Sequence, residues 1–397
     1  MGLGRFGGGL GVTKWLLEKG AQVLLTDIMT EEQLRPQLNE LGSHPNIKTV
    51  LGEHRFQDFS ETDIVIANPA VATPWDNPYL KTAWDSGVRV TTEIELSLQY
   101  IDRNQVIGVT GTSGKSTTCS MIHAALETSG IPSHLGGNIG GSLLRLIDEI
   151  KPSDFIVLEL SSAMLWWLDK NWMWSPHIAV LTNIEENHVD WHGSFEEYVR
   201  CKKLIFAHQT ENDVALTQDP KATFSGLQVL GQHNEQNAAV AFLAANAIGA
   251  DANRARTGIQ NFRGLPHRLQ QVKQGIYNDS KSTTPLATKR AIDSFPDSTK
   301  LHVIVGGYDK KVDLSLLAQQ ASRVGGMYLI GTTADEIASK SPQGAQVCKT
   351  LDCAVKAALK SMGENDVLLL SPGCASWDQF DNYEERGEKF CELVTAS

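Results

Sequence analysis

The sequence predicts an α/β protein with parallel sheets, divided into more than one domain. The chain has 397 residues, which corresponds to roughly two to three domains of common size. Short β-rich runs alternate with stretches of helical composition, as in parallel α/β units. Polar, glycine-containing loops follow several of these runs, and such loops are where parallel sheets bind ligands.

The composition is that of a folded, acidic protein. Hydrophobic residues make up 41% of the chain and charged residues 20%, close to ordinary globular usage. The 35 basic and 46 acidic residues leave a net charge of −11, so we expect neither a nucleic acid nor a membrane as partner. Anionic substrates would then be held locally by helix N-termini, glycine loops or Mg²⁺.

The cysteine pattern and the N-terminal residues predict a soluble, cytoplasmic protein. Six cysteines are scattered without a C-x-x-C pair, which is typical of a reduced compartment and disfavours a zinc site at Cys348 and Cys353. The N-terminus has no apolar signal segment, and no apolar run reaches the roughly 18 residues of a membrane span.

The first block contains a G-x-G-x-x-G motif at Gly2–Gly7, followed by a helix expected at 13–19 and a strand ending at Asp27. Asp27 lies 20 residues after Gly7, as expected of an acid that hydrogen-bonds a ribose hydroxyl. The motif therefore indicates a phosphate-bearing nucleotide, although a glycine turn without a ligand would give the same pattern. No strand precedes Gly2, so we expect the first strand of this block to be missing.

The second block opens with a strand at 105–110 and the sequence TGTSGKSTT at 110–118, which leads into a helix. Glycine N–H groups would face phosphate oxygens, Lys115 would reach the β- and γ-phosphates, and the Ser116 hydroxyl could bind Mg²⁺. Val109 stands where the strict phosphate-loop motif has glycine, but the chemistry does not depend on that position. This block is predicted to bind ATP or GTP.

Two further side chains of this block are candidate Mg²⁺ ligands. Glu159 lies in an apolar strand, where an unpaired carboxylate would be costly; the alternative is a buried acid paired with an arginine. His188 follows a strand expected at 178–184 and stands among acids, whereas the role of His192 stays open. From spacing alone, Lys202 and Lys203 would belong to a solvated helix face.

The third block begins near 262–268, where glycine and proline mark a boundary. Polar loops follow three of its strands, at 278–283, 306–310 and 371–376. Because the carboxyl ends of parallel strands share one edge of a sheet, these loops predict a second binding edge.

Several segments in the same order resemble the Mur ligase family of ATP-dependent amide ligases. They are TGTSGKSTT (110–118), ELSS (159–162), TNIEENHVDWHGSFEEYVRCK (182–202), GQHNEQNA (231–238), GLPHR (264–268), NDSKST (278–283), GGYDKK (306–311) and SPGCASWDQFDNYEERG (371–387). The last four are most similar to members that add D-glutamate to UDP-N-acetylmuramoyl-L-alanine.

The resemblance implies three α/β domains. They are a Rossmann-like UDP-substrate domain at 1–99, a central P-loop ATPase-like domain at 100–264 and a Rossmann-like amino-acid domain at 265–397. It implies ATP and Mg²⁺ as cofactors, UDP-N-acetylmuramoyl-L-alanine and D-glutamate as substrates, and an acyl-phosphate intermediate. We also expect the protein to be a monomer.

The resemblance also implies roles for individual residues. ATP binding falls to Gly111, Thr112, Ser113, Gly114, Lys115, Ser116, Thr117, Asn237, Arg268 and Asp279. Contacts to the UDP substrate fall to Gly4, Arg5, Phe6, Asp27 and Asn138, and contacts to D-glutamate to Thr283, Lys310, Ser376 and Tyr383. Lys115, Glu159, His188 and Lys202 are the implied catalytic residues. The implied Mg²⁺ ligands are Ser116, Glu159, His188 and Lys202, the last as a carbamate.

Other functions are open at this point. A nicotinamide-dependent dehydrogenase would explain the glycine loop but not the G-K-S motif. Folylpolyglutamate synthetase relatives share the ATP block but lack a UDP domain. A Mur ligase with another amino-acid specificity is a further alternative. A truncated, inactive nucleotide-binding homologue is another, because the UDP domain would lack its first strand. Met29 and Ala70 depart from the family pattern and bear on how the UDP group is bound.

Overall fold

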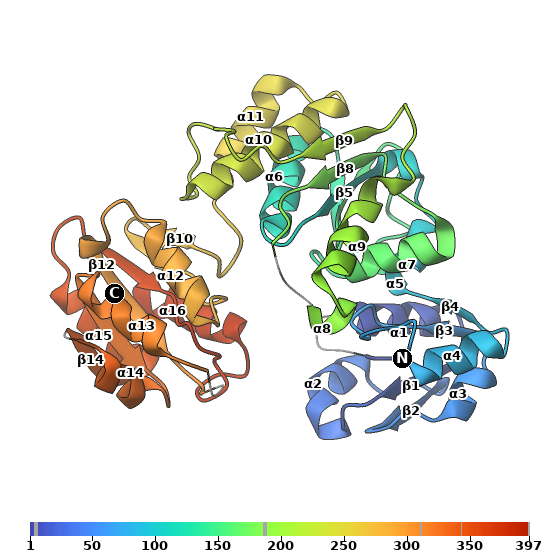
Figure 1. Ribbon diagram of the computed structural model, residues 1–397, viewed down its shortest axis with the longest axis horizontal. Coiled ribbons are helices and arrows are strands. Elements are labelled where there is room, and N and C mark those ends of the chain that lie inside the picture. The colour runs from blue at the N-terminus through green and yellow to red at the C-terminus, as the bar shows by residue number, and fades with distance from the viewer. Residues whose placement is uncertain (4–6, 186–188, 310–311, 343, 396–397) are drawn as a thin grey trace. The chain divides into compact units, whose positions relative to one another are not determined.

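The computed structural model describes residues 1–3, 7–185, 189–309, 312–342 and 344–395. The chain forms two compact units, each built of parallel strands and covering helices (Figure 1). Unit 1 comprises Met1–Phe224 and Glu235–Ile259, and unit 2 comprises Ser225–Asn234 and Gln260–Ser397. The predicted α/β class is confirmed. None of the described helices combines the length and apolar character needed to span a bilayer.

The N-terminal part of unit 1 holds two parallel strand pairs, β1–β2 and β3–β4. Residues 1–3 run between them, because Gly2 N donates to Thr26 O (2.8 Å) and Asn68 N donates to Met1 O (3.0 Å). The strands are β1 (Val23–Asp27), β2 (Ile47–Leu51), β3 (Ile64–Ile66) and β4 (Arg89–Thr91). The helices are α1 (Gly8–Glu18), α2 (Glu31–Leu41), α3 (Phe56–Ser60), α4 (Pro78–Asp85) and α5 (Glu93–Leu98).

The second part of unit 1 is a five-stranded parallel sheet with the order β6-β7-β5-β8-β9. Its strands are β5 (Val106–Thr110), β6 (Ser133–Gly137), β7 (Phe155–Glu159), β8 (Ile178–Leu181) and β9 (Val214–Thr217). Its helices are η1 (Arg103–Gln105), α6 (Lys115–Thr128), η2 (Leu143–Arg145), α7 (Ser162–Trp172), α8 (Val189–His192), α9 (Phe195–Ala207), α10 (Gln232–Ala247) and α11 (Ala252–Gln260). The carboxyl ends of β5, β7 and β8 therefore meet at one edge.

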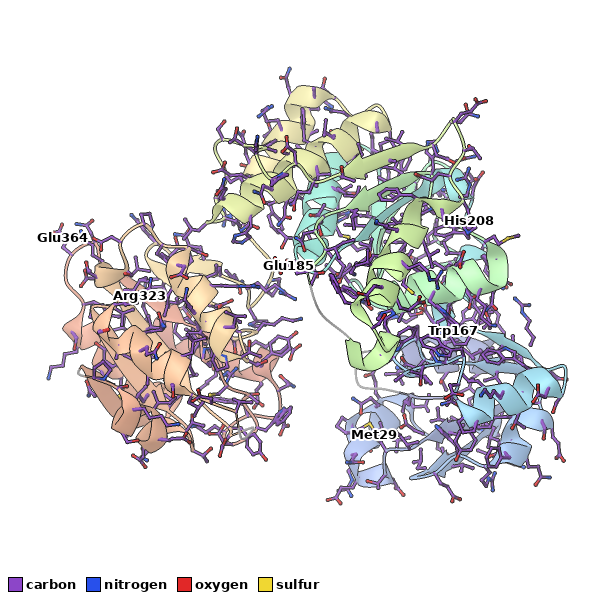
Figure 2. All side chains as sticks on the ribbon, viewed as in Figure 1. Met29, Trp167, Glu185, His208, Arg323 and Glu364 are labelled. Atoms are coloured by element: carbon purple, nitrogen blue, oxygen red, sulfur yellow. The ribbon has the colours of Figure 1, made fainter. Side chains whose placement is uncertain are left out.

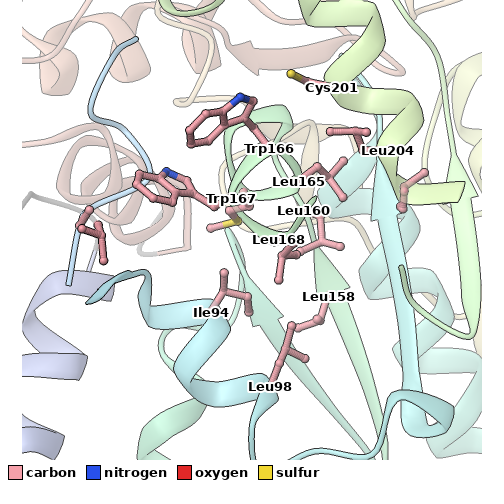
Figure 3. Close-up of a cluster of buried hydrophobic side chains, with 14 of the residues drawn as sticks. Ile94, Leu98, Leu158, Leu160, Leu165, Trp166, Trp167, Leu168, Cys201 and Leu204 are labelled. Carbon is pink, nitrogen blue, oxygen red and sulfur yellow. The ribbon is translucent and has the colours of Figure 1, made fainter. Parts of the chain in front are cut away.

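A core of large apolar side chains holds α7 and α9 against this sheet. Figure 3 shows Leu158 and Leu160 beside Leu165, Trp167 and Leu168, all of them buried. At about 25 cal/mol per Å² of apolar surface, each such side chain contributes roughly 1.5–3 kcal/mol to folding. The packing fixes α7 and α9, which carry functional side chains, relative to the strand ends.

Unit 2 contains a six-stranded sheet with the order β10-β11-β15-β12-β13-β14, parallel except for the edge strand β10. Its strands are β10 (Gln270–Lys273), β11 (Ile276–Asn278), β12 (Leu301–Gly306), β13 (Gly326–Ile330), β14 (Ala345–Lys349) and β15 (Val367–Leu370). Its helices are α12 (Pro285–Asp293), η3 (Ser298–Lys300), α13 (Ser315–Ala318), η4 (Gln319–Ser322), α14 (Ala334–Lys340), α15 (Leu351–Ser361) and α16 (Tyr383–Thr395).

Helices cover both faces of this sheet, so its strands are apolar on both sides. Along β12, Val303 and Val305 pack toward α12, α13 and α14, whereas Ile304 packs toward α15 and α16. The loops after β11, β12 and β15 leave the sheet at the same edge, as the three polar loops in the sequence predict.

Candidate active site

The loop between β5 and α6 is shaped by two glycines with positive φ. Gly111 has φ 152° and Gly114 has φ 81°, backbone conformations that side-chain-bearing residues rarely adopt. A Cβ atom on Gly111 would collide with Thr182 Oγ1, and one on Gly114 would lie 2.5 Å from Asn237 Oδ1. The loop therefore turns tightly into the N-terminus of α6, and the first turn of a helix is a suitable place for an anion.

Two lysine side chains converge on the same carbonyl oxygen of this loop. Lys115 Nζ donates to Gly111 O and Thr112 O, both at 2.9 Å, and Lys202 Nζ donates to Gly111 O at 2.7 Å. Lys202 is only 2% exposed. Burial and, to a smaller extent, the nearby positive charge of Lys115 together lower the pKa of the Lys202 amine to about 7.

Lys202 faces inward because of its position on α9. Ser194 accepts a hydrogen bond from Glu197 N and so starts the helix. Tyr198, Cys201, Lys202 and Ile205 then follow at helical spacing as the buried stripe, while Lys203 is exposed. The default prediction of a solvated lysine pair was therefore wrong for Lys202 and right for Lys203.

Ser116 and Glu159 bring two oxygen ligands together beside the loop. Ser116 Oγ, in the first turn of α6, donates to Glu159 Oε2 at the end of β7 at 2.7 Å. Glu159 is buried, and its partner is a hydroxyl, not an arginine. Hard oxygen donors of this kind suit Mg²⁺. Within the described ranges, no three His, Cys, Asp or Glu side chains are grouped to hold a metal, and His188 lies outside those ranges.

The segment after β8 packs on the phosphate-type loop. The strand ends at Leu181, three residues earlier than predicted, because the following residues pair with the loop instead of continuing the sheet. Ser113 N donates to Asn183 Oδ1 (3.0 Å), and Glu185 N donates to Thr112 Oγ1 (2.9 Å). Glu185 is labelled at this point of unit 1 in Figure 2.

The structure thus brings together most of the ATP-block candidates. The residues that lie at this edge of unit 1 are Gly111, Thr112, Ser113, Gly114, Lys115, Ser116, Thr117, Glu159, Lys202 and Asn237. Asn138 is beside them, since its N–H donates to Glu159 O at 3.0 Å.

The UDP-site candidates are described only in part. Asp27 ends β1 and is buried, and its Oδ1 accepts from Met29 N at 2.8 Å. Gly4, Arg5 and Phe6 lie outside the described residues. Asp27 thus occupies the strand end that its spacing from Gly7 predicts.

In unit 2, the loop after β11 is anchored by a buried carboxylate. Asp279 accepts hydrogen bonds from Ser371 Oγ (2.8 Å) and Leu269 N (3.2 Å). Burial raises the pKa of Asp279 to about 6, although these hydrogen bonds act in the opposite direction. Arg268, also predicted at the nucleotide, is exposed in the same unit.

The candidates for the D-glutamate site lie on the neighbouring loops of unit 2, apart from Lys310, which is outside the described residues. Thr283 follows the β11 loop, and Tyr383 begins α16, where its hydroxyl accepts from Lys281 Nζ at 2.9 Å. Ser376 is 2% exposed, and its hydroxyl has no hydrogen-bond partner among the described residues. A buried hydroxyl without a partner is costly in the free protein and suits a ligand contact.

Arg386 is a site residue that the sequence reasoning missed. Its guanidinium is 1% exposed and donates to Ser280 Oγ (3.0 Å), Ser280 O (2.8 Å) and Cys374 O (3.1 Å). Burial lowers its pKa to about 10. The available signal was helical spacing, because Arg386, Phe390 and Val394 are four residues apart and all buried. Arg386 therefore ties two loops of the predicted binding edge to α16.

Comparison with known proteins shows which family this chain belongs to. Family models match three successive segments: the Mur ligase MurD-like N-terminal domain at residues 1–92, the Mur ligase middle domain at 109–227 and the Mur ligase glutamate ligase domain at 267–374. The chain belongs to the Mur ligase family. The predicted three-domain architecture and the resemblance are both confirmed, while the exact boundaries at residues 99 and 264 stay predictions.

Individual relatives are similar to this chain over nearly its whole length. The chain is 33% identical to a UDP-N-acetylmuramoylalanine–D-glutamate ligase of Acidobacterium capsulatum, covering 100% of this chain and 95% of the relative. It is 34% identical to the enzyme of the same name from Geobacillus kaustophilus, covering 97% and 95%. Among solved structures, the UDP-N-acetylmuramate-alanine ligase of Thermotoga maritima shares the fold, with a TM-score of 0.60, 18% identity and coverage of 98% and 97%.

Proposed function

We propose that this chain is an ATP-dependent amide ligase that adds D-glutamate to UDP-N-acetylmuramoyl-L-alanine in peptidoglycan precursor synthesis. The observation that carries the proposal is the convergence of Lys115, Lys202, Ser116 and Glu159 on one phosphate-type loop. It occurs in a chain that aligns with ligases of that name over its whole length.

The nucleotide site follows from the chemistry of the loop. The N-terminus of α6 and Lys115 bind the β- and γ-phosphates of ATP, with Asn237, Arg268 and Asp279 as further nucleotide contacts. Mg²⁺ supplies charge neutralisation on the phosphoryl oxygens when it is bound. Ser116 and Glu159 would hold it, together with His188 and a carbamate on Lys202.

The reaction needs positioning and charge stabilisation and no nucleophilic side chain. The γ-phosphoryl group of ATP passes to the alanyl carboxylate, which forms an acyl phosphate and releases ADP. The D-glutamate amine then attacks the acyl carbon, loses a proton and displaces phosphate to form the amide. Negative charge gathers on phosphoryl and carbonyl oxygens during both steps, where Lys115 and the α6 N–H groups stabilise it.

The substrate contacts are divided between the two units. In unit 1, Asp27 and Asn138, with Gly4, Arg5 and Phe6, bind the UDP substrate. In unit 2, Thr283, Ser376, Tyr383 and Lys310 bind D-glutamate. The Ser376 hydroxyl, which has no hydrogen-bond partner in the part of the chain that the structure describes, supports this assignment. We further propose that the enzyme acts in the cytoplasm and that it is a monomer. Sedimentation at the concentration used in the assay would test the oligomeric state.

A phosphate-release assay tests the proposal. The purified chain is supplied with ATP, Mg²⁺ and UDP-N-acetylmuramoyl-L-alanine, and D-glutamate is compared with L-glutamate, L-alanine, L-lysine and meso-diaminopimelate. Turnover should require both the UDP substrate and D-glutamate. Equal turnover with another amino acid would move the chain to a different specificity within the family, and no turnover with any would favour an inactive nucleotide-binding homologue.

A further inference from the structure

The loop that follows β3, residues 68–77, borders the glycine loop of unit 1; we call it the β3 loop. Asn68 Nδ2 donates to Gly2 O (3.4 Å), and Asn68 N donates to Met1 O (3.0 Å). The β3 loop thus lies at the carboxyl end of a parallel strand, beside the first residues of the predicted phosphate-binding motif. Ligands of parallel α/β sheets bind at such an edge.

A tryptophan from a distant part of the sequence holds this loop. Trp191, in α8, donates from its indole Nε1 to Pro69 O at 3.2 Å across 122 residues of sequence. The Trp191 ring also lies edge-on to Trp75 of the β3 loop, with centroids 5.5 Å apart. Trp166, on α7, contacts both rings, at 5.5 Å from Trp75 and 6.3 Å from Trp191.

Apart from the bond from Trp191 and the bonds of Asn68 to Met1 and Gly2, the hydrogen bonds of the β3 loop among the described residues are local. Ala70 N donates to Asn68 Oδ1 (3.0 Å), Val71 N to Asn68 O (3.0 Å) and Asp76 N to Thr73 O (2.8 Å). Such turns set the shape of a loop but do not fix its position on the protein. Asn68 fixes the first residue of the loop, and Trp191 fixes the residues that follow, because its buried indole N–H is costly to leave unpaired and its ring packs against Trp75.

We propose that Trp191 is a positioning residue for the UDP substrate: it holds the β3 loop in the geometry that accepts the substrate's nucleotide portion. Trp191 lies in the chain segment between β8 and α9, so the second part of unit 1 thereby shapes the binding edge of the first. The inference rests on the proposed substrate, and it assigns to Trp191 no contact with the reacting atoms.

The matched pair Trp191→Phe and Trp167→Phe tests this role. Trp167 is fully buried in the same core (Figure 3), but its indole N–H has no partner among the described residues. Both changes remove the same atoms, and only Trp191→Phe removes a hydrogen bond to the β3 loop. Trp191→Phe should raise KM for the UDP substrate about three- to tenfold, the effect of one neutral hydrogen bond. Its kcat and its KM for ATP and D-glutamate should stay near wild type.

Hydrogen exchange of the unliganded protein provides a readout that does not depend on activity. Amides of the β3 loop should exchange faster in Trp191→Phe and at the wild-type rate in Trp167→Phe. The exchange measurement tests the role of Trp191 even if the wild-type chain does not turn over the proposed substrate. Failure of the proposed function can therefore be told apart from failure of this inference. Unchanged exchange in Trp191→Phe, or an equal rise in UDP-substrate KM in both variants, would overturn the proposal.

A second variant covers the case in which Trp191→Phe does not fold. Trp75 is 36% exposed, so Trp75→Leu removes the ring that meets Trp191 with little risk to the core. It should likewise raise KM for the UDP substrate and loosen the β3 loop. Wild-type KM together with wild-type exchange in Trp75→Leu would count against the proposal.

Discussion

Lys115 and Lys202 donate hydrogen bonds to one and the same acceptor, the carbonyl oxygen of Gly111, at 2.9 and 2.7 Å. Two ammonium groups at one carbonyl repel each other, and burial adds to the cost of charging Lys202. The repulsion is therefore smallest when Lys115 stays cationic, as phosphate binding requires, and Lys202 loses its charge. The first two predictions follow from this difference.

Lys115→Ala should lose nearly all turnover. Its charge lies at the loop proposed to bind the phosphates, and losing one preorganised stabilising group costs about 3–4 kcal/mol, or a rate on the order of 100–1,000-fold. Phosphate release under saturating substrates measures the loss. Lys203→Ala is the matched control, because Lys203 is exposed one residue after Lys202 and should leave turnover intact. Near-normal activity in Lys115→Ala would contradict the ATP site.

Lys202 is predicted to react with CO₂ and form a carbamate. The reaction uses the neutral amine, and a pKa of about 7 keeps much of this amine neutral near pH 7, whereas an ordinary lysine is protonated. The product carries two oxygens that suit Mg²⁺. With ¹³C-bicarbonate, a carbamate resonance should appear in the wild-type protein and in Lys203→Ala but not in Lys202→Ala.

The pH dependence of that resonance follows from the same pKa. Below pH 7 the Lys202 amine takes up a proton and no longer reacts, so the signal should be stronger at pH 8 than at pH 6. Full activity in Lys202→Ala, or a signal that survives in it, would mean that the lysine has no such role.

Ser376→Ala should weaken the binding of D-glutamate without lowering the stability of the fold. The Ser376 hydroxyl is buried without a partner among the described residues, so its removal should leave the free energy of unfolding unchanged or slightly raised. KM for D-glutamate should rise about three- to tenfold if this hydroxyl bonds the substrate. Ser371→Ala is the contrast, since Ser371 Oγ bonds Asp279 and Thr288, and its loss should destabilise by about 1–2 kcal/mol. An unchanged KM in Ser376→Ala would remove Ser376 from the site.

Arg386→Lys should damage the amino-acid side of the enzyme. An ammonium group cannot reproduce the planar set of hydrogen bonds to Ser280 and Cys374, and it leaves buried oxygens unpaired. We expect a loss of about 2–4 kcal/mol in the free energy of unfolding, measured by denaturant titration, and a raised KM for D-glutamate. Arg323→Lys, at an exposed arginine paired with Asp293, should change stability by less than about 0.5 kcal/mol. Equal stability losses in the two variants would refute a special role for Arg386.

The sequence predicted the fold class and the gathering of residues 111–117 at a strand end because both depend on local signals. Strand, glycine loop and helix follow one another at 105–128, so residues 111–117 had to lie at a strand end. Order along the chain also placed Asp27, Glu159 and Asp279 at strand ends, where the structure has them.

What the sequence alone determined, then, is which residues stand at the carboxyl ends of the strands, because strand periodicity and glycine turns are written into neighbouring positions. Only the tertiary structure decided that Lys202 is buried against Gly111, that Arg386 joins two loops, and that Trp191 holds Pro69. These contacts span 91, 12 and 122 residues in sequence. They depend on how helices pack on the sheets, and a lysine, an arginine or a tryptophan on a helix carries no local sign of the partner that packing will give it.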